Sequence, residues 1–559
     1  MNFFTDNDDI SLALSLADME RLATLSEHGF CFAKDFDWAP KDAADAADSY
    51  RRVLELVGEI AAERLAPTAA ETDRNGSVLG DDGQVHYAKG IREAIDLFGK
   101  AGLMGFTLPY KYGGLNMPAT LYTAATEIVS RADASFMNIF GLQGIAETIN
   151  AFASDELKDA YLPDLAAGRT TGAMVLTEPD AGSDLQAVAT RAYIADDGEW
   201  RVNGVKRFIT NGCGDVLIVL ARTEEGSTDG RGLSCLLVEK GPRVRVRRIE
   251  DKLGIHGSPT CEIVFDDAPA KLIGLRQRGL ITYVMSLMNA ARLGIAAQSL
   301  GIGEAALRVA TDYAKERRQF GAAIATFPAI ADLLFTMSSD LQAARAITYY
   351  AAVCVDLERG LEDKQQSRKY RNFCKLLTPM AKYYSSEMSM RVANGAVAVL
   401  GGSGYMRDYP AERLLRDSRI TTIYEGTSQL QIVAASGGVL GGTLKEAVED
   451  ALASREWDET LAPEVAKVRE VVALIDEAVA FVKTQDAAYR DLSARRLVDM
   501  SAIALAGALL CEQAAVCEQK KRILSRWMLE GVAKAKAMHA IVVSGDAAPI
   551  APQAGAESR

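Results

Sequence analysis

One short stretch near residue 425 combines the groups that a general base needs. Residues 423–431 read IYEGTSQLQ and contain one carboxylate, Glu425, between Tyr424 and Gly426. An aromatic neighbour and apolar flanks remove water from a carboxylate and raise its pKa, which suits proton abstraction. A glycine lets the backbone approach a ligand closely, so that an amide can reach a carbonyl oxygen. The stretch therefore predicts a base beside a flat ligand, although a plain turn acid is the commoner meaning of one isolated motif.

Two more stretches contain apolar runs that end in polar turns. Residues 174–184 read MVLTEPDAGSD, an apolar run that enters a turn of Pro, Asp, Gly and Ser residues. Such turns expose backbone amides and hydroxyl groups, which suit the carbonyls and phosphates of a flavin nucleotide. Residues 208–212, FITNG, end a strand-like segment with an aromatic ring, a hydroxyl and a turn.

Five motifs in one order indicate a family. Along the chain come TEPDAGSD (177–184), FITNG (208–212), ERRQFG (316–321), LGGSGY (400–405) and IYEGTSQLQ (423–431). In this order and at these spacings, the sequence resembles the acyl-CoA dehydrogenase family of flavoproteins over roughly residues 50–440.

The resemblance implies the FAD-dependent α,β-dehydrogenation of an acyl-CoA thioester to the trans-2-enoyl-CoA. Glu425 would abstract the α-proton, and the β-hydride would go to flavin N5. Hydrogen bonds to the thioester oxygen would stabilise the enolate charge as it develops. Some relatives carry the base just before the arginine of a helical segment. Here Ala291 precedes Arg292, which favours Glu425 as the base.

The resemblance also implies which residues bind the cofactor and the substrate, and it implies no metal ligand. Positions that match the family's flavin contacts within one subunit are Met174, Leu176, Thr177, Ser183, Phe208, Ile209, Thr210, Thr427 and Gln429. Positions that match its contacts to the FAD of a neighbouring subunit are Arg317, Phe320, Gly401 and Gly402. Positions that match its substrate contacts are Ser183, Asn289, Arg292, Tyr424 and Gly426.

Three positions depart from the family pattern. Pro328 and Ala398 stand where glutamines near the dinucleotide are common, and His256 stands where many relatives have an arginine. A lone histidine in a loop is more often structural than catalytic, so His256 has no role in the expected mechanism. Methionines that could line the acyl pocket, although core packing is their commoner role, are Met104, Met285 and Met288.

Length and composition limit the alternatives. With 559 residues, of which 49% are apolar and 25% charged, the chain is long enough for several globular domains. The net charge of −13 argues against non-specific binding to nucleic acid or anionic lipid. The best apolar run, 501–511, is too short to span a membrane, and the N-terminus does not resemble a secretory signal. Eight scattered cysteines and four histidines give no metal pattern, so we expect a cytoplasmic enzyme with reduced thiols.

The pattern of elements predicts an α+β, mainly α fold. Residues 49–170 have helical spacing, for example over 50–65, and residues 171–279 contain short β-branched runs between turns. Helical patterns return over 280–440, as in a four-helix bundle. This order matches the N-terminal helical domain, central β domain and C-terminal bundle of the acyl-CoA dehydrogenase family. Residues 1–48 form an N-terminal extension that either meets a partner or the substrate entrance, or packs on the protein's own surface.

Residues 441–559 predict a helical C-terminal extension with a disordered tail after Ser544. A glycine-rich segment, 437–442, predicts a hinge before it, and the segments 465–482 and 502–532 are amphipathic. The chain resembles very-long-chain and 3-methylthiopropanoyl-CoA dehydrogenases in carrying such an extension. In these relatives the extension covers the face that pairs dimers into tetramers in smaller members. We therefore expect a homodimer, with peripheral membrane contact as the alternative role of the extension.

The resemblance implies electron-transfer flavoprotein as the acceptor, and two rival functions remain. An acyl-CoA oxidase would use oxygen instead, but the sequence around Glu425 favours a dehydrogenase. A non-catalytic DNA-associated flavoprotein would have a basic C-terminal domain, whereas residues 443–559 contain 15 Lys and Arg against 18 Asp and Glu. The acyl group stays open, because a dicarboxylic substrate would need a buried Arg or Lys that the sequence alone cannot locate.

Overall fold

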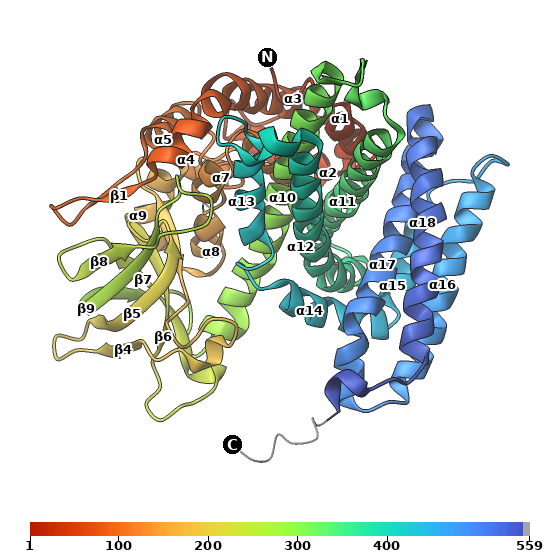
Figure 1. Cartoon of the computed structure of the whole chain (residues 1–559). Helices are drawn as coiled ribbons and strands as arrows, with labels where there is room; N and C mark the ends of the chain where they lie inside the picture. Colours follow the sequence, from red (N-terminus) through yellow and green to blue (C-terminus); the bar gives the residue numbers. More distant parts are fainter. Residues whose placement is uncertain (143, 552–559) are drawn as a thin grey trace, which may run out of the picture.

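The first part of the chain is helical, as the sequence predicts. The computed structural model describes residues 1–142 and 144–551 (Figure 1). The helices before the main sheet are α1 (Asp8–Ser15), α2 (Met19–Ser26), α3 (Ala43–Ile60), α4 (Ala69–Asn75), α5 (Lys89–Lys100), α6 (Ala119–Ala132), α7 (Ala134–Gly141), α8 (Gly144–Phe152) and α9 (Asp155–Ala166). A short hairpin of β1 (Val78–Leu79) and β2 (Val85–His86) lies between α4 and α5.

Helix α3 begins earlier than its hydrophobic spacing predicts. The Asp42 side chain accepts a backbone N–H of the first turn and caps the helix, so that α3 starts at Ala43 rather than at Tyr50. Its α-helical part ends at Ile60, and residues 61–65 continue it as a π turn. The boundary expected after residue 48 therefore falls inside a helix.

The N-terminal extension packs largely on the protein itself. Helix α1 contacts the later helix α11 (Pro328–Gly360), and α2 packs against both α3 and α11. The rings of Phe32 and Phe36 lie 5.8 and 5.7 Å from the ring of Tyr110, whereas Trp38 is 60% exposed. These contacts favour surface packing for the aromatic loop, with Trp38 as its exposed residue.

The central domain is a sheet whose strand pairings close into a ring. Its strands are β3 (Gly172–Val175), β4 (Arg191–Ile194), β5 (Trp200–Thr210), β6 (Val216–Arg222), β7 (Leu233–Glu239), β8 (Val244–Ile249) and β9 (Thr260–Leu272). Pairing runs from β6 through β4, β5, β9 and β7 back to β6, while β3 adds to β6 and β8 adds to β9. Consecutive side chains of β6 from Val216 to Ala221 are all buried. Because alternate side chains point to opposite sides of a strand, both faces of β6 are covered. One side meets a core shared with α8 and α9, and the other meets a core made mainly by strands.

A bundle of long helices follows the sheet. Helices α10 (Met285–Glu316), α11 (Pro328–Gly360) and α12 (Lys364–Leu400) pack against one another, and α6 packs on α10. The hairpin of β10 (Arg318–Gln319) and β11 (Ala322–Ala323) connects α10 to α11. The shorter helices α13 (Ala411–Thr421) and α14 (Ser428–Leu440) complete this domain. Figure 1 shows the bundle between the β domain and the C-terminal helices drawn in blue.

The C-terminal extension consists of α15 (Thr443–Leu452), α16 (Ala462–Lys483), α17 (Ala487–Val516) and α18 (Glu518–Val543). Helix α17 packs on α11, α14, α15, α16 and α18, so the extension is part of the same packed body.

The C-terminal part corrects one expectation and adds detail to two others. The segment 437–442 is not a hinge, since α14 continues to Leu440 and only Gly441 and Gly442 form a turn. The amphipathic segment 502–532 is divided between α17 and α18, because Cys517 adopts an extended conformation between them. Behind Ser544, residues 548–550 form a 3-10 turn. The last part of the expected disordered tail, 552–559, lies outside the described residues.

The expectation about membrane spans also needs correction. The segment Gly279–Glu316 and helix α17 are long and apolar enough to cross a membrane, judged by length and composition only. In α17, however, 89% of the most apolar window is buried inside the protein, as in the core helix of a bundle. In Gly279–Glu316 this share is 39%.

Candidate active site

A cavity of about 900 Å³ lies where the three domains meet. Its walls come from α7 and α8, from β3 and β5, from α10, α11 and α12, and from the loop between α13 and α14. Predicted site residues that line it are Met174, Thr210, Asn289, Tyr424 and Glu425. The fold therefore brings three of the sequence motifs and the start of α10 to one hollow.

The Glu425 backbone adopts a conformation that non-glycine residues rarely have. Its φ is +54°, and Gly426 follows with a φ of +87°. Two side chains hold this turn. Lys382 Nζ donates to Gly426 O at 2.7 Å, and Gln431 Nε2 donates to the carbonyl oxygens of Glu425 and Gly426, each at 3.0 Å. Because several bonds fix the turn, the rest of the fold determines the unusual conformation.

The surroundings of Glu425 tune its carboxylate toward the role of a base. Burial raises the pKa of Glu425 to about 7, and the positive charges of Lys382 and Arg292 oppose this rise. Burial also lowers the pKa of Lys382 to about 7, against the pull of Glu425. Among the described residues, the backbone N–H of Glu425 donates no hydrogen bond, so it remains available to an oxygen in the cavity.

Tyr424 connects the same loop to the N-terminal domain. Its hydroxyl donates to Gln298 Oε1 on α10 and lies 3.1 Å from Asn138 Oδ1 on α7. Gln298 in turn donates to Asn138 Oδ1 and to the carbonyl oxygen of Ala134, each at 3.0 Å. These hydrogen bonds position the Glu425 loop relative to α7 and α10.

Arg292 stands behind the cavity wall, and Asn289 forms part of it. The guanidinium of Arg292 donates from Nη1 to Asn289 Oδ1 at 2.9 Å. Burial lowers the pKa of Arg292, whereas the charge of Glu425 raises it. Arg292 therefore supplies positive charge near the base and orients an amide that a ligand can reach.

The flavin motifs divide into cavity-facing and buried residues. Met174 and Thr210 line the cavity, while Leu176 and Ile209 are buried in the two cores of the β domain. The side chains of these two buried residues therefore pack in the cores and do not face the cavity. Phe208 is 53% exposed with a φ of +60°, and it interrupts the regular pairing of β5 with β9. Thr177 and Ser183 on the loop after β3, Thr427 at the N-cap of α14 and Gln429 in its first turn are exposed or half-buried.

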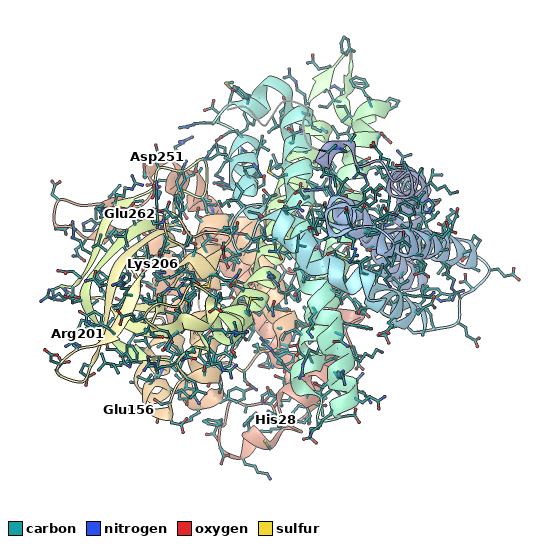
Figure 2. The ribbon with its side chains drawn as sticks, turned by 90° about the horizontal axis from the view of Figure 1, so that it is seen from below. His28, Glu156, Arg201, Lys206, Asp251 and Glu262 are labelled. Atoms are coloured by element: carbon teal, nitrogen blue, oxygen red, sulfur yellow. The ribbon has the colours of Figure 1, made fainter. Side chains whose placement is uncertain are left out.

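A buried ion pair, not expected from the sequence, joins the two flavin segments. Lys206 on β5 is fully buried and bonds Glu178 Oε1 at 2.9 Å and the carbonyl oxygen of Leu176 at 2.7 Å. Glu178 also accepts the backbone N–H groups of Ala189 and Thr190 at 2.8 and 2.9 Å. Figure 2 shows Lys206 among the strands of the β domain. The pair holds TEPDAGSD against the strand that ends in FITNG.

Arg317 and Phe320 lie far from the cavity. Arg317 follows the C-terminal end of α10, 25 residues after Arg292, which corresponds to about 37 Å along a helix axis. Phe320 lies in the hairpin after α10 and is 97% exposed. Neither residue can therefore reach a ligand in the cavity of its own chain.

Gly401 and Gly402 lie near that same end of α10. They follow α12, and the hydroxyl of Tyr313 on α10 donates to Ser403 Oγ at 3.3 Å. A side chain built at either glycine would meet nothing within 4 Å, and Gly401 has a φ of +60°. This surface is open to another backbone or to a flat ring. The nearby ring of Phe320 and the Arg317 guanidinium are also exposed, so this surface offers aromatic, cationic and backbone groups of the kinds that contact a nucleotide.

The methionines and the departures from the family pattern have separate locations. Met285 lines the cavity, but Met104 is fully buried in the helical core and Met288 packs on the β-domain core, so neither of these two lines the cavity.

Pro328 is the first residue of α11 and Ala398 lies in the last turn of α12. His256 Nδ1 faces the backbone carbonyl and the carboxylate of Asp73, and Nε2 faces the carbonyl oxygen of Lys252. All of these oxygens accept, so the ring acts as a donor to α4 and to the loop of Lys252, as a structural residue would.

Several contributors to the site are missed by sequence reasoning. A lysine within the apolar run around Lys382 signals a buried charge, but not the element that it meets.

Among the described residues, no group of three or more His, Cys, Asp or Glu side chains could hold a metal ion. All eight cysteines are free thiols.

Comparison with known proteins agrees with this arrangement. Family models for the acyl-CoA dehydrogenase N-terminal, middle and C-terminal domains match residues 47–169, 173–268 and 278–440. An acyl-CoA dehydrogenase of Bacillus subtilis is 42% identical over 360 residues, covering 63% of this chain and 90% of its own. The structure of butyryl-CoA dehydrogenase from Megasphaera elsdenii is 34% identical with a TM-score of 0.63, covering 70% and 98% of the two chains.

A further structure extends the likeness of the fold into the C-terminal helices. It is that of an acyl-CoA dehydrogenase from Bacillus anthracis complexed with FAD, with a TM-score of 0.77 at 24% identity. It covers 89% of this chain and 88% of its own. On the three matched domains and these relatives, the chain belongs to the acyl-CoA dehydrogenase family.

Proposed function

We propose that this enzyme oxidises an acyl-CoA thioester to its trans-2-enoyl-CoA, with Glu425 as the base that removes the α-proton. One observation carries the proposal. Glu425 is a desolvated carboxylate with a pKa of about 7, and it lines a cavity large enough for an acyl chain. A base with a pKa near the working pH combines a useful ionised fraction with good proton affinity.

The residues around Glu425 would perform three tasks. The free N–H of Glu425 would donate to the thioester oxygen and stabilise negative charge as the α-proton leaves. Tyr424 and its bonds to α7 and α10 would keep the carboxylate at a constant height above the substrate. Apolar cavity walls would exclude water from the reacting atoms.

FAD is the cofactor of this family, and when bound it would supply the acceptor for the hydride of the β-carbon. Met174, Phe208 and Thr210 would hold its ring, and Ser183 would contact its pyrophosphate or the CoA. Thr427 and Gln429 would approach it from the Glu425 loop. Arg317, Phe320, Gly401 and Gly402 would reach the FAD of a second copy of this chain, which supports a homodimer.

The test is an anaerobic titration of the purified flavoprotein with a panel of acyl-CoA thioesters, followed by flavin absorbance. We expect at least one thioester to bleach the oxidised flavin. In Glu425→Gln the bleaching rate should fall by at least about a thousandfold, because the amide cannot accept the proton, while FAD remains bound. Normal bleaching of Glu425→Gln would exclude this residue as the base.

The electron acceptor that we propose is an electron-transfer flavoprotein, and oxygen is the rival. Family membership supports the dehydrogenase over an oxidase. The same substrate should reduce electron-transfer flavoprotein through the enzyme and form little hydrogen peroxide in air. Stoichiometric peroxide with no reduction of the acceptor would make the enzyme an oxidase.

A further inference from the structure

The wall of the cavity changes character along its length. The lining side chains on α7 and α10 are mainly apolar, for example Met137 and Leu293, as is Ile145 on α8. The part of the wall formed by α8, α11 and α12 carries five charged side chains. They are Glu147, Glu358, Arg359, Arg371 and Lys375.

Helix α12 shows how far these charges lie from the base. Lys382 bonds the carbonyl of Gly426 and so marks the level of the Glu425 loop. Lys375 and Arg371 precede it by seven and eleven residues, which keeps all three on one face of the helix. At 1.5 Å per residue, the charges lie about 10 and 16 Å from that level along the axis. The cavity therefore leads from the base along an apolar section to a charged end.

Hydrogen bonding leaves positive charge unmatched at this end. Arg371 donates to Glu358 at 3.1 Å, whereas Arg359 reaches Glu147 only at 3.5 Å. Throughout the described part of the chain, Lys375 has no ion pair or hydrogen bond to another side chain. Three cationic side chains thus face two carboxylates at an exposed end of the cavity, where Arg359 and Arg371 are 53% and 57% exposed and Lys375 is exposed as well. The cations therefore lie at the surface and not in the buried position that the sequence argument required.

The neighbouring Asp356 attracts Arg359 electrostatically, but its hydrogen bonds go to other groups. Its carboxylate accepts the backbone N–H groups of Ala119 and Thr120 at 2.7 and 2.9 Å and the Thr120 hydroxyl at 2.6 Å. These groups form the positive N-terminal end of α6, which offsets the charge of Asp356. Asp356 also does not line the cavity.

We propose that this end of the cavity binds an anionic group at the distal end of the acyl chain, so that the substrate class is an ω-carboxyacyl-CoA. This inference rests on the proposed function, because it assumes that the thioester lies at Glu425. Lys375 and Arg359 are the groups that pair with the carboxylate. The ammonium group of Lys375 has no side-chain partner among the described residues, and the long bond from Arg359 to Glu147 can be replaced by a bond to a ligand. At about 1.25 Å per carbon, the axial distance of about 10 Å between the level of the Glu425 loop and Lys375 corresponds to a chain of about eight carbons.

The experiment compares two matched series on the purified holoenzyme. Adipyl-, suberyl- and sebacyl-CoA are tested against hexanoyl-, octanoyl- and decanoyl-CoA, with the anaerobic rate of flavin reduction as the readout. We expect kcat/KM to favour the ω-carboxy thioester by about tenfold or more for at least one length, as one charged hydrogen bond supplies. A preference for the unsubstituted thioester at every length would overturn the inference.

Two variants connect the preference to this site. Lys375→Met and Arg359→Gln should each reduce the ratio of the two kcat/KM values by about tenfold. Lys364→Met, the same exchange at an exposed position of α12 outside the cavity, should leave the ratio unchanged. A ratio that stays constant in both Lys375→Met and Arg359→Gln would place the specificity elsewhere.

A binding measurement separates this inference from the proposed function. Calorimetry of suberyl-CoA and octanoyl-CoA with the same holoenzyme gives the ratio of the two dissociation constants without turnover. If neither series reduces the flavin, the proposed function fails. The subsite then still stands if suberyl-CoA binds about tenfold more tightly and Lys375→Met removes that difference, and it falls if the two ligands bind equally.

Discussion

At the residue scale, Glu425 and Lys382 form one titrating unit. Both groups have a pKa of about 7, since burial disfavours the charged form of each and each charge favours the other. Lys382 also bonds the carbonyl of Gly426, so the same lysine positions the loop that carries the carboxylate. The lysine acts through Glu425 and is a positioning residue.

The first prediction concerns pH. Only the ionised carboxylate can accept a proton, so kcat/KM for flavin reduction should rise with pH and level off above a midpoint near 7. A pH series from about 5.5 to 8.5, measured with one reducing thioester, checks this. A rate that falls through this range would contradict the assignment of Glu425 as the free-enzyme base.

The second prediction concerns Lys382→Met. Removal of the cation removes an interaction that lowers the pKa of Glu425, so the midpoint of the pH profile should move to higher pH. The rate at pH 7 should fall by about fivefold, since a rise of one unit from a pKa of about 7 lowers the ionised fraction from about one half to about one eleventh. Lys364→Met is the matched control. An unchanged midpoint with a reduced rate would mean that Lys382 acts through loop packing alone.

At the element scale, the strands that carry the flavin motifs depend on the pair of Lys206 and Glu178. This pair lies between β5 and the loop after β3, where both side chains are buried. Desolvation makes such a pair a small net contributor to stability, but the loss of one partner leaves an uncompensated buried charge. The geometry of both flavin motifs should therefore respond to a single substitution.

The third prediction follows from this pair. Lys206→Ala should lower the free energy of unfolding of the β domain by about 3–5 kcal/mol and reduce the FAD content of the purified protein. Lys271→Ala, which breaks an exposed pair with Glu239 on the same sheet, should cost less than about 1 kcal/mol. Chemical denaturation and the ratio of flavin to protein absorbance measure both effects. Equal decreases in the free energy of unfolding and in FAD content in the two variants would mean that the buried Lys206 pair stabilises the domain no more than the exposed pair does.

At the scale of the whole molecule, the two groups of predicted FAD residues cannot serve one site within a chain. About 37 Å of α10 separates the level of Arg292 from Arg317. A two-fold dimer would bring the Arg317 end of one copy to the cavity of the other, and each dimer would contain two such sites. The packed extension of α15–α18 covers another side of the bundle (Figure 1).

The fourth prediction tests this shared site. Glu425→Gln and the double variant Arg317→Ala, Phe320→Ala should each be inactive as homodimers, the second because FAD is lost. Co-expression should restore about a quarter of the wild-type rate, because half of randomly formed dimers are mixed and each mixed dimer has one intact site. Light scattering should show two copies per particle. No recovery in mixed dimers that contain FAD would mean that each site belongs to a single chain.

The sequence by itself determined the features that short segments encode. The motif around Glu425 indicates a desolvated base through its immediate neighbours, and the burial of that residue agrees with this. The change from helical to strand spacing near residue 171 is local, and helices and strands follow it closely. Helix ends without a strong local signal were missed by the prediction. At Cys517, for example, neither glycine nor proline marks the end of α17.

Only the tertiary structure decided which distant residues meet. Hydrophobic spacing identifies the face of a helix but not the element opposite that face, so Met104 and Met285 look alike in sequence although only Met285 lines the cavity. The same reason hides the charges of Lys375 and Arg359, which lie on two different helices and become one feature only when α11 and α12 enclose a common space. Contacts of this kind depend on chain packing over long sequence separations, which no local pattern of residues contains.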